Sequence, residues 1–249
     1  MEQRHRALIV GGANGIGLAI AVLMASDDST EVVHIVDKAD VPAAYLLPKM
    51  QVHRFDVTSP DYSFFDRFAD IDTLMITAGF GSLALFVDTP EDLITSSFAV
   101  NTIPALRLIH RFYSRLLSSE PFRCGVMVSI AGYMSSPFFS VYAATKAALR
   151  IFIESINVEL EQAGTTNRVL NVSPGNINGT SFDGAETVVS TVEPLAREVI
   201  SHLDARDDLF IPQYDEVYRT VLERAHADFR AEGRHSYEYK LERLKHSNK

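Results

Sequence analysis

The sequence predicts an α/β protein with a doubly wound parallel sheet of about seven strands and helices on both faces. Short apolar runs alternate along the chain with longer segments in which apolar residues recur at helical spacing. The runs are continuously apolar, as in parallel strands that helices cover on both sides. This βαβα order requires right-handed crossovers. The chain shows no Pro/Gly/Ser-rich linker and no repeat. We therefore expect one domain over residues 1–249.

The individual elements follow from these patterns in order. The expected strands cover residues 6–10, 31–36, 51–55, 72–77, 124–130, 167–172 and 209–211. Helical patterns occupy residues 16–26, 91–117, 141–162 and 188–203. The last segment, residues 228–249, mixes charges with Tyr237, Leu241 and Leu244 at helical spacing, and it predicts a charged, helical C-terminal tail.

Composition narrows the classes of function. The 249 residues are 47% hydrophobic and carry a net charge of −9, which is globular and argues against nucleic acid as the main partner. A single cysteine, Cys124, permits no internal disulfide and indicates a reducing compartment, so we expect a cytoplasmic protein. The uncharged stretch 7–26 is interrupted by glycines, so it predicts neither a signal peptide nor a membrane span.

A glycine-rich turn joins the first strand to the first helix. Glycines there allow a tight turn and a close backbone approach to a pyrophosphate, which the N–H groups of the helix start can bind. An acidic residue, Asp37, ends the second strand 20 residues after the turn, where a carboxylate can bind the ribose 2′-OH of NAD. This indicates a Rossmann-type fold that prefers NAD(H), although the adjacent Lys38 leaves NADP(H) open. The candidate turn residues are Gly11, Asn14, Gly15, Ile16 and Gly17.

Together with this turn, the motif Tyr142-Ala-Ala-Thr-Lys146 resembles the short-chain dehydrogenase/reductase family. Ser129 lies 13 residues before Tyr142, the spacing of that family's catalytic serine. The resemblance covers residues 6–211 and implies a catalytic group of Ser129, Tyr142, Lys146 and Asn101, with Asn101 holding a water linked to Lys146. Tyr142 and Lys146 would also contact the cofactor. Further cofactor contacts are implied at Asp56, Val57, Ala78, Gly79, Pro174, Gly175 and Ile177.

The sequence departs from that family at several positions. Val10 stands where the glycine motif usually begins with threonine, and Ile76-Thr77 stands where two asparagines are usual. The threonine that follows Pro174-Gly175 is displaced to Thr180, and the charged tail replaces the family's Asp-Gly-Gly segment.

The chemistry of the catalytic group can also be derived from its residues. Hydride reduction of a carbonyl leaves negative charge on oxygen, and a free tyrosine with a pKa of about 10 is a poor acid near neutrality. Lys146 lies one helical turn after Tyr142, so we expect its positive charge, with that of oxidised nicotinamide, to lower the pKa of the phenol. Ser129 can donate a hydrogen bond to the substrate oxygen.

These observations predict an oxidoreductase that transfers a hydride between NAD(H) and a small or medium, apolar secondary alcohol or ketone. One alternative is a non-catalytic NAD(H)-binding redox sensor, which would not need Ser129, Tyr142 and Lys146 together. Another is a 3-oxoacyl-thioester reductase, although the sequence shows no clear basic patch for an acidic carrier protein.

Three further expectations concern the surroundings of the site. Six side chains suggest an apolar substrate wall: Phe80, Tyr133, Met134, Phe138, Phe139 and Phe182. Eight histidines without ligand spacing predict no metal. The small residues Ala143, Ala144, Ala147 and Ala148 permit close helix approach and, with the resemblance, suggest a homodimer or homotetramer.

Overall fold

The computed structural model describes residues 4–178 and 187–247, and within them seven parallel strands form one sheet. The spatial order is β3-β2-β1-β4-β5-β6-β7, and every neighbouring pair is parallel. The strands are β1 (His5–Val10), β2 (Thr30–Asp37), β3 (Met50–Arg54), β4 (Thr73–Ile76), β5 (Arg123–Met127), β6 (Val169–Val172) and β7 (Leu209–Phe210). The strand order reverses between β1 and β4, the place where such sheets bind ligands. The predicted fold class is confirmed.

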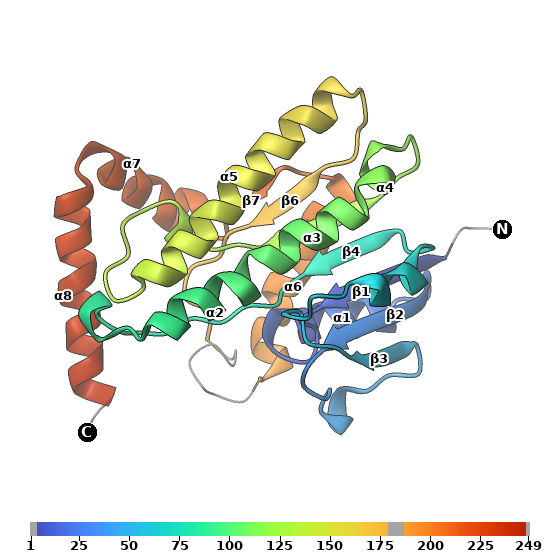
Figure 1. Cartoon of the computed structure of the whole chain (residues 1–249), viewed down its shortest axis with the longest axis horizontal. Coiled ribbons are helices and arrows are strands. Elements are labelled where there is room, and N and C mark those ends of the chain that lie inside the picture. Colours follow the sequence, from blue (N-terminus) through green and yellow to red (C-terminus); the bar gives the residue numbers. More distant parts are fainter. Residues whose placement is uncertain (1–3, 179–186, 248–249) are drawn as a thin grey trace.

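Helices cover both faces of this sheet (Figure 1). On one face lie α1 (Gly15–Ser26) and α6 (Val189–Ala205), which pack on each other. On the other face lie α3 (Ile103–Arg111) and α5 (Ser140–Gln162). The predicted helices 141–162 and 188–203 agree with α5 and α6 to within two residues.

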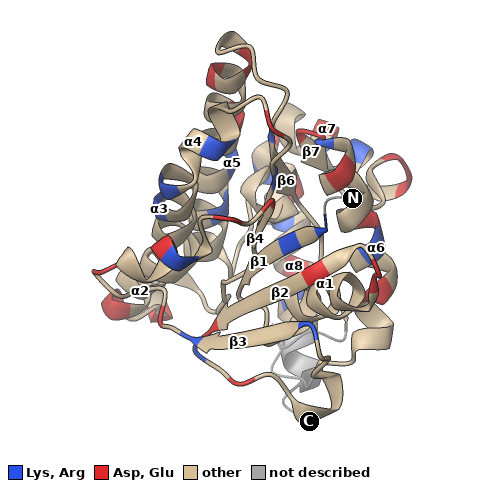
Figure 2. Ribbon diagram, turned by 90° about the vertical axis from the view of Figure 1, so that its right-hand side faces the viewer, with Lys and Arg blue, Asp and Glu red and all other residues tan. Residues whose placement is uncertain are grey.

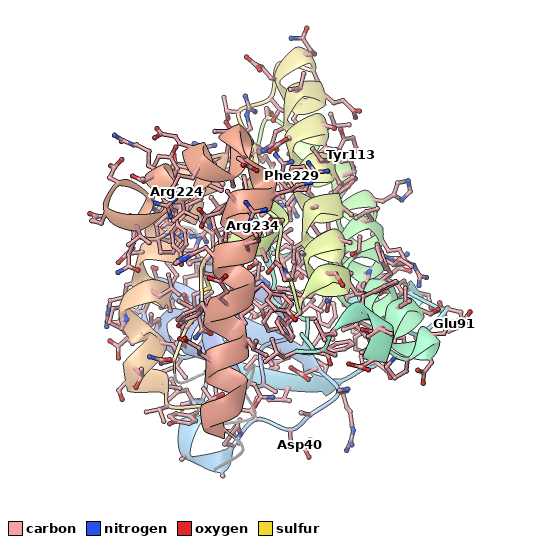
Figure 3. The ribbon with its side chains drawn as sticks, turned by 90° about the vertical axis from the view of Figure 1, so that its left-hand side faces the viewer. Asp40, Glu91, Tyr113, Arg224, Phe229 and Arg234 are labelled. Atoms are coloured by element: carbon pink, nitrogen blue, oxygen red, sulfur yellow. The ribbon has the colours of Figure 1, made fainter. Side chains whose placement is uncertain are left out.

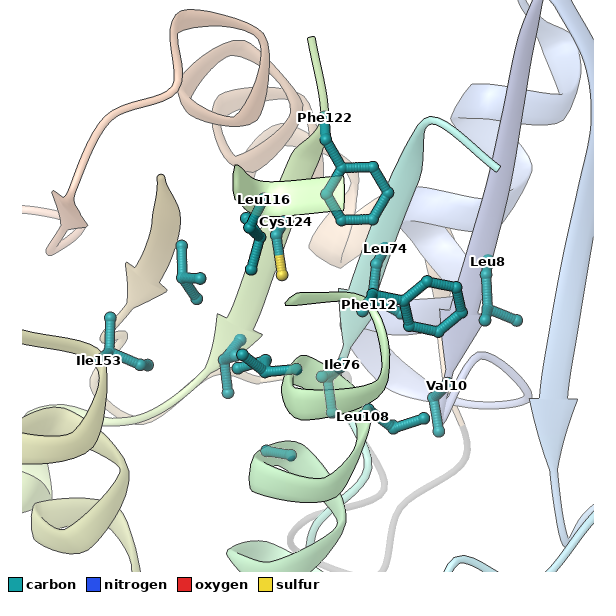
Figure 4. Close-up of a cluster of buried hydrophobic side chains, with 14 of the residues drawn as sticks. Leu8, Val10, Leu74, Ile76, Leu108, Phe112, Leu116, Phe122, Cys124 and Ile153 are labelled. Atoms are coloured by element: carbon teal, nitrogen blue, oxygen red, sulfur yellow. The ribbon is translucent and has the colours of Figure 1, made fainter. Parts of the chain in front are cut away.

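The strands bury side chains on both faces, in two separate cores. Along β1, Leu8 and Val10 join the core beneath α3 and α5, whereas Ala7 and Ile9 join the core beneath α1 and α6. This alternation is the two-residue period of a strand. Figure 4 shows the first core, in which Leu8, Val10 and Leu74 lie close to Phe112, and Cys124 is buried beside Leu116.

The prediction of a single helix over residues 91–117 is wrong. The structure divides this segment into α2 (Glu91–Asn101), α3 and α4 (Tyr113–Leu117). The chain turns at Thr102, whose φ of −119° and ψ of −60° depart from helical values, and Pro104 in the first turn of α3 has no N–H to donate. The break places Asn101 at the end of α2, where its side chain reaches the site.

The C-terminal part of the chain packs against one end of the molecule. After β7, a π-helical turn (Tyr214–Tyr218) leads into α7 (Arg219–Ala227) and α8 (Phe229–Ser247). Figure 1 shows α8 beside the start of α5, at the end of the molecule opposite the N-terminus. Residues 228–247 are therefore helical apart from Asp228, as far as the structure describes them.

Three features of the described residues concern nucleic acids, membranes and metal ions as partners: surface charge, helix hydropathy and the grouping of metal-ligating side chains. Figure 2 shows that basic and acidic residues both occur on the helices that cover the sheet. In the described part of the chain, no helix is both long and apolar enough to span a membrane. Across residues 4–178 and 187–247, no three His, Cys, Asp or Glu side chains gather as metal ligands would.

Candidate active site

The glycine turn packs directly on the residues that follow β4. Gly11 has a φ of +92°, which L side chains rarely adopt, and a Cβ there would lie 2.3 Å from the backbone nitrogen of Ala78. A Cβ on Gly17 would lie 2.3 Å from Oγ1 of Thr77. That hydroxyl donates to the Gly11 carbonyl at 2.8 Å, so Thr77 supplies a hydrogen bond to the turn where the family motif has asparagine. The turn therefore requires glycine at both positions.

The start of α1 presents backbone N–H groups at the edge of the sheet. Asn14 is the N-cap but makes no side-chain capping bond, so the first-turn N–H groups of Ile16 and Gly17 keep their capacity to donate to an anion. The N–H of Gly15 donates to the hydroxyl of Thr187 at 2.8 Å. Thr187 lies 172 residues from Gly15 along the chain, so no local sequence pattern links the two residues.

Asp37 closes β2 beside this turn. Its Oδ2 accepts a hydrogen bond from the N–H of Ala13 at 3.0 Å, and its Oδ1 accepts one from Ala39 at 3.0 Å. Each carboxylate oxygen has a second lone pair for a ribose hydroxyl. The structure therefore brings the acidic residue and the glycine turn together, as their spacing predicts.

Asp56 and Val57 lie just beyond β3, on the same edge of the sheet. Oδ1 of Asp56 accepts bonds from the N–H and the hydroxyl of Thr58, both at 2.8 Å, and these bonds lower the pKa of the carboxyl. The carbonyl of Val57 accepts the hydroxyl of Tyr62 at 2.5 Å. Both residues thus occupy a loop that local hydrogen bonds hold in place.

Ser129, Tyr142 and Lys146 meet at the carboxyl end of β5. Ser129 lies two residues after the end of β5, and its buried hydroxyl is hydrogen-bonded to that of Tyr142, which lies in the first turn of α5. Lys146 lies one turn later, and its Nζ is 5.6 Å from the centroid of the Tyr142 ring. That Nζ donates to the carbonyl of Met127 at 2.8 Å. The three side chains thus lie in one group at the edge of the sheet.

The pKa values in this group differ from the sequence expectation. Burial raises the pKa of Tyr142 to about 12, and the hydrogen bond from Ser129 opposes that shift only in part. Burial also lowers the pKa of Lys146 to about 8. A lysine with that pKa is mostly neutral where such a phenol titrates, so Lys146 does not by itself lower the pKa of Tyr142.

Asn101 and Gly79 complete the group. The side-chain amide of Asn101 accepts from the N–H of Phe80 at 2.9 Å and donates to the carbonyl of Phe80 at 2.9 Å. It also donates to Oγ1 of Thr145 at 3.2 Å. A Cβ on Gly79 would lie 3.3 Å from Oδ1 of Asn101 and 3.4 Å from Nζ of Lys146. Asn101 therefore ties the segment after β4 to the helix that carries Tyr142.

The turn after β6 lies against Ser129. The carbonyl of Pro174 accepts from the N–H of Ile130 at 3.0 Å and from the Ser129 hydroxyl at 3.4 Å. A Cβ on Gly175 would lie 1.7 Å from the hydroxyl oxygen of Tyr218. Tyr218, from the π-helical turn, is a second residue that no local sequence pattern links to its partner. Ile177 packs beside the core under α1 and α6.

The expected apolar wall is only partly assembled beside Tyr142. Phe138 and Tyr142 line one small cavity of about 10 Å³. Tyr133 turns inward, and its hydroxyl accepts from Nδ2 of Asn171 at 2.8 Å. Met134 lines a separate hollow of about 650 Å³, together with Ala143, Ala144 and Ala147, and Phe229 of the same chain closes one side of it. Phe182 lies outside the described residues.

Comparisons with known proteins concern the chain as a whole. A family model described as short chain dehydrogenase matches residues 5–188. The uncharacterized oxidoreductase YvaG of Bacillus subtilis (strain 168) is 26% identical, over 82% of this chain and 79% of that protein. Sorbitol dehydrogenase of Cereibacter sphaeroides is also 26% identical, over 77% of each chain.

Solved structures share the fold. A short chain dehydrogenase/reductase from Burkholderia phymatum in complex with NAD has a TM-score of 0.76 at 17% identity, and the match covers 93% of this chain and 96% of that one. An alcohol dehydrogenase from the archaeon Thermococcus sibiricus, complexed with 5-hydroxy-NADP, has a TM-score of 0.69 at 19% identity, covering 84% and 95%.

Proposed function

The chain belongs to the short-chain dehydrogenase family of NAD(P)-dependent oxidoreductases, and from this premise we propose that it transfers a hydride between NAD(H) and an apolar secondary alcohol or its ketone. The substrate class is small or medium in size. The observation that carries the proposal is the group formed by Ser129, Tyr142 and Lys146 at the carboxyl end of β5. A protein that only binds a dinucleotide has no need of that group.

The residues around the strand-order reversal fit a dinucleotide. Gly11 and Gly17 leave no room for a Cβ beside Thr77 and Ala78, so the turn packs tightly and holds the start of α1 at the edge of the sheet, where a pyrophosphate would bind. The N-terminus of α1 supplies N–H donors and the positive end of the helix dipole. Asp37 would bind the adenosine ribose, and Lys146 would bind the nicotinamide ribose. When bound, the dinucleotide supplies or accepts the hydride.

Tyr142 moves the proton in this proposal. With a pKa near 12, its hydroxyl is protonated at neutral pH and can donate a proton to the oxygen of a ketone as that oxygen gains negative charge. Ser129 donates a second hydrogen bond to the same oxygen and stabilises the developing charge. In alcohol oxidation the phenolate must accept the proton, so a positive charge near the phenol is needed to lower its pKa.

Asn101 has a positioning role in this proposal, since it contacts residues on either side of the group and not the substrate. Its bonds to Phe80 and Thr145 fix the distance between the segment after β4 and α5, and we propose that a water at Asn101 links Lys146 to solvent. Through such a water Lys146 could exchange its proton with solvent, while its Nζ keeps the hydrogen bond to the carbonyl of Met127.

A panel of secondary alcohols and ketones tests the proposed activity. The absorbance of the reduced nicotinamide at 340 nm, read with NADH or NADPH, should show turnover of apolar ketones with a higher kcat/KM for NADH. Asp37→Ser should lower kcat/KM for NADH about tenfold, the scale of a lost charge-assisted hydrogen bond, while the value for NADPH changes less or rises. Asp40→Ser, at an exposed residue three positions on, is the matched control. Better use of NADPH by the unmodified chain would contradict this assignment.

We also propose that copies of the chain associate through α3 and α5. Ile103, Ile151 and Val158 on these helices are 48%, 52% and 57% exposed, and contact with a second copy would remove this apolar surface from water. Light scattering at micromolar concentration should therefore give the mass of a dimer or tetramer, and Ile151→Glu should reduce it. A monomer mass for the unmodified chain would exclude this association.

A further inference from the structure

The segment that leads into Tyr142 contains a strained residue. Residues 135–139 connect the turn after Ser129 to α5, and Phe138 in this segment has a φ of 66°. A bulky residue rarely adopts that left-handed conformation, and it persists where the surroundings fix it. Phe138 is also 5% exposed, so its ring is held as well as its backbone.

Two contacts from outside the segment fix the backbone of Phe138. The carbonyl of Pro137, on one side of it, accepts a hydrogen bond from Nζ of Lys240 on α8 at 2.9 Å. The carbonyl of Phe138 itself accepts from the N–H of Ala84, in the loop after β4, at 2.9 Å. Since the φ and ψ of Phe138 relate these two peptide groups, holding both of them holds the strained conformation.

Further contacts attach α8 to the same segment. Nζ of Lys240 also donates to Oγ of Ser136 at 2.8 Å and lies 5.2 Å from the ring centroid of Phe139. The ring of Tyr237, one turn earlier on α8, lies 4.9 Å from the ring of Phe138.

The beginning of α8 also reaches this segment. The hydroxyl of Ser135 donates to the carbonyl of Phe229 at 3.0 Å, and a Cβ on Gly233 would lie 2.9 Å from that hydroxyl oxygen. Figure 3 shows α8 crossing in front of the molecule, with Phe229 near its upper end beside α5. Residues of α8 from Phe229 to Lys240 thus contact segment 135–139, so most of the length of this helix lies against the segment.

The held segment forms part of the surroundings of Tyr142. The ring of Phe139 lies 5.8 Å from the ring of Tyr142, and Phe138 and Tyr142 line the same small cavity. A shift of Phe138 or Phe139 would therefore move the wall against which a substrate beside the Tyr142 hydroxyl would rest.

We infer that Lys240 is a positioning residue for substrate: from α8 it holds segment 135–139 in the form that completes the substrate side of the site. This inference rests on the proposed oxidoreductase function. The side chain of Lys240 is partly buried between α8 and this segment, and burial lowers its pKa to about 8. Its two hydrogen bonds are made by a single ammonium group, so no uncharged side chain of the same length can replace it.

The test compares Lys240→Met with Arg234→Met. Methionine keeps the length of the side chain and removes the donors, and Arg234 is an exposed cation on the same helix, so both variants lose one positive charge. We expect faster hydrogen exchange of the backbone N–H groups of residues 135, 136, 138 and 139 in Lys240→Met alone. We also expect KM for the ketone to rise about tenfold, with a smaller change in kcat and with NADH affinity unchanged. Lys240→Arg, which keeps donors at this position, should restore KM in part.

Each outcome decides the inference. Unchanged exchange in Lys240→Met, or faster exchange with an unchanged KM, would overturn it, as would equal effects in Arg234→Met. If the unmodified chain reduces no ketone, the proposed function fails, whereas the exchange comparison still decides whether Lys240 holds the segment. Should Lys240→Met not fold, Tyr237→Leu removes the ring contact with Phe138 and is subject to the same measurements.

Discussion

Replacing Tyr142 with phenylalanine should lower kcat for ketone reduction by about 10²-fold or more, the usual contribution of a general acid. The variant keeps the ring and loses only the hydroxyl that is hydrogen-bonded to Ser129, so the substrate oxygen loses its proton donor. Lys146 keeps its bond to the carbonyl of Met127 in the variant, and the glycine turn is not touched. NADH affinity, measured by fluorescence titration, should therefore remain near that of the unmodified chain.

Tyr113→Phe is the matched control for this experiment. Tyr113 lies on α4, and its hydroxyl contacts the carboxylate of Glu159 near the end of α5, whereas Tyr142 lies in the first turn of that helix. Its loss should leave kcat within about twofold, the scatter of a surface substitution. Near-normal turnover in Tyr142→Phe would remove Tyr142 from the mechanism. If the unmodified chain bound NADH but reduced no ketone, the redox-sensor alternative would instead be favoured.

Replacing Gly11 with alanine should both destabilise the fold and abolish dinucleotide binding. A left-handed backbone costs an L residue about 1–2 kcal/mol, and the added methyl group would lie 2.3 Å from the backbone nitrogen of Ala78. Overpacking of this kind costs about 1–3 kcal/mol more. Because the neighbour is backbone, relief requires the turn to move away from Ala78, which displaces the N–H groups of α1.

Gly164→Ala separates the cost of a left-handed backbone from the cost of the steric contact with Ala78. Gly164 also has a positive φ, of +78°, but a Cβ there would have no atom within 4 Å. Thermal unfolding should show the smaller loss, about 1–2 kcal/mol, with unchanged NADH binding, because only the backbone conformation is strained. For a chain of this length each kcal/mol corresponds to about 2–4 °C in Tm. Equal Tm values for the two variants would show that the contact between Gly11 and Ala78 does not limit the turn.

Much of the site is local in sequence and could be predicted. Tyr142 and Lys146 share a helix face because four residues make about one turn, and Ser129 and Asp37 reach one edge because parallel strands end on the same side of a sheet. The requirement for glycine at positions 11 and 17 is also a property of a tight strand-to-helix turn. Each of these relations depends on backbone periodicity within a short segment, which the order of residues reveals directly.

Contacts between distant segments were not predictable in the same way. Thr187 reaches the N–H of Gly15 and Tyr218 reaches Gly175, although neither residue belongs to a motif with its partner. Lys240 binds a segment more than 100 residues earlier. Even the break at Thr102 is stabilised from elsewhere, since its hydroxyl donates to the carbonyl of Thr145 at 3.1 Å.

The pKa of Tyr142 shows most clearly the difference between what the sequence determines and what the tertiary structure decides. The expected lowering combines the charges of Lys146 and of oxidised nicotinamide, whereas burial by the chain itself raises the pKa of Tyr142 to about 12. Residue order specifies which groups can interact along a strand or a helix, and it was enough to predict the glycine turn, the sheet edge and the proximity of Ser129, Tyr142 and Lys146. How far water is excluded from each group depends on everything that packs around it, and solvent exclusion decides the charge that Tyr142 and Lys146 carry.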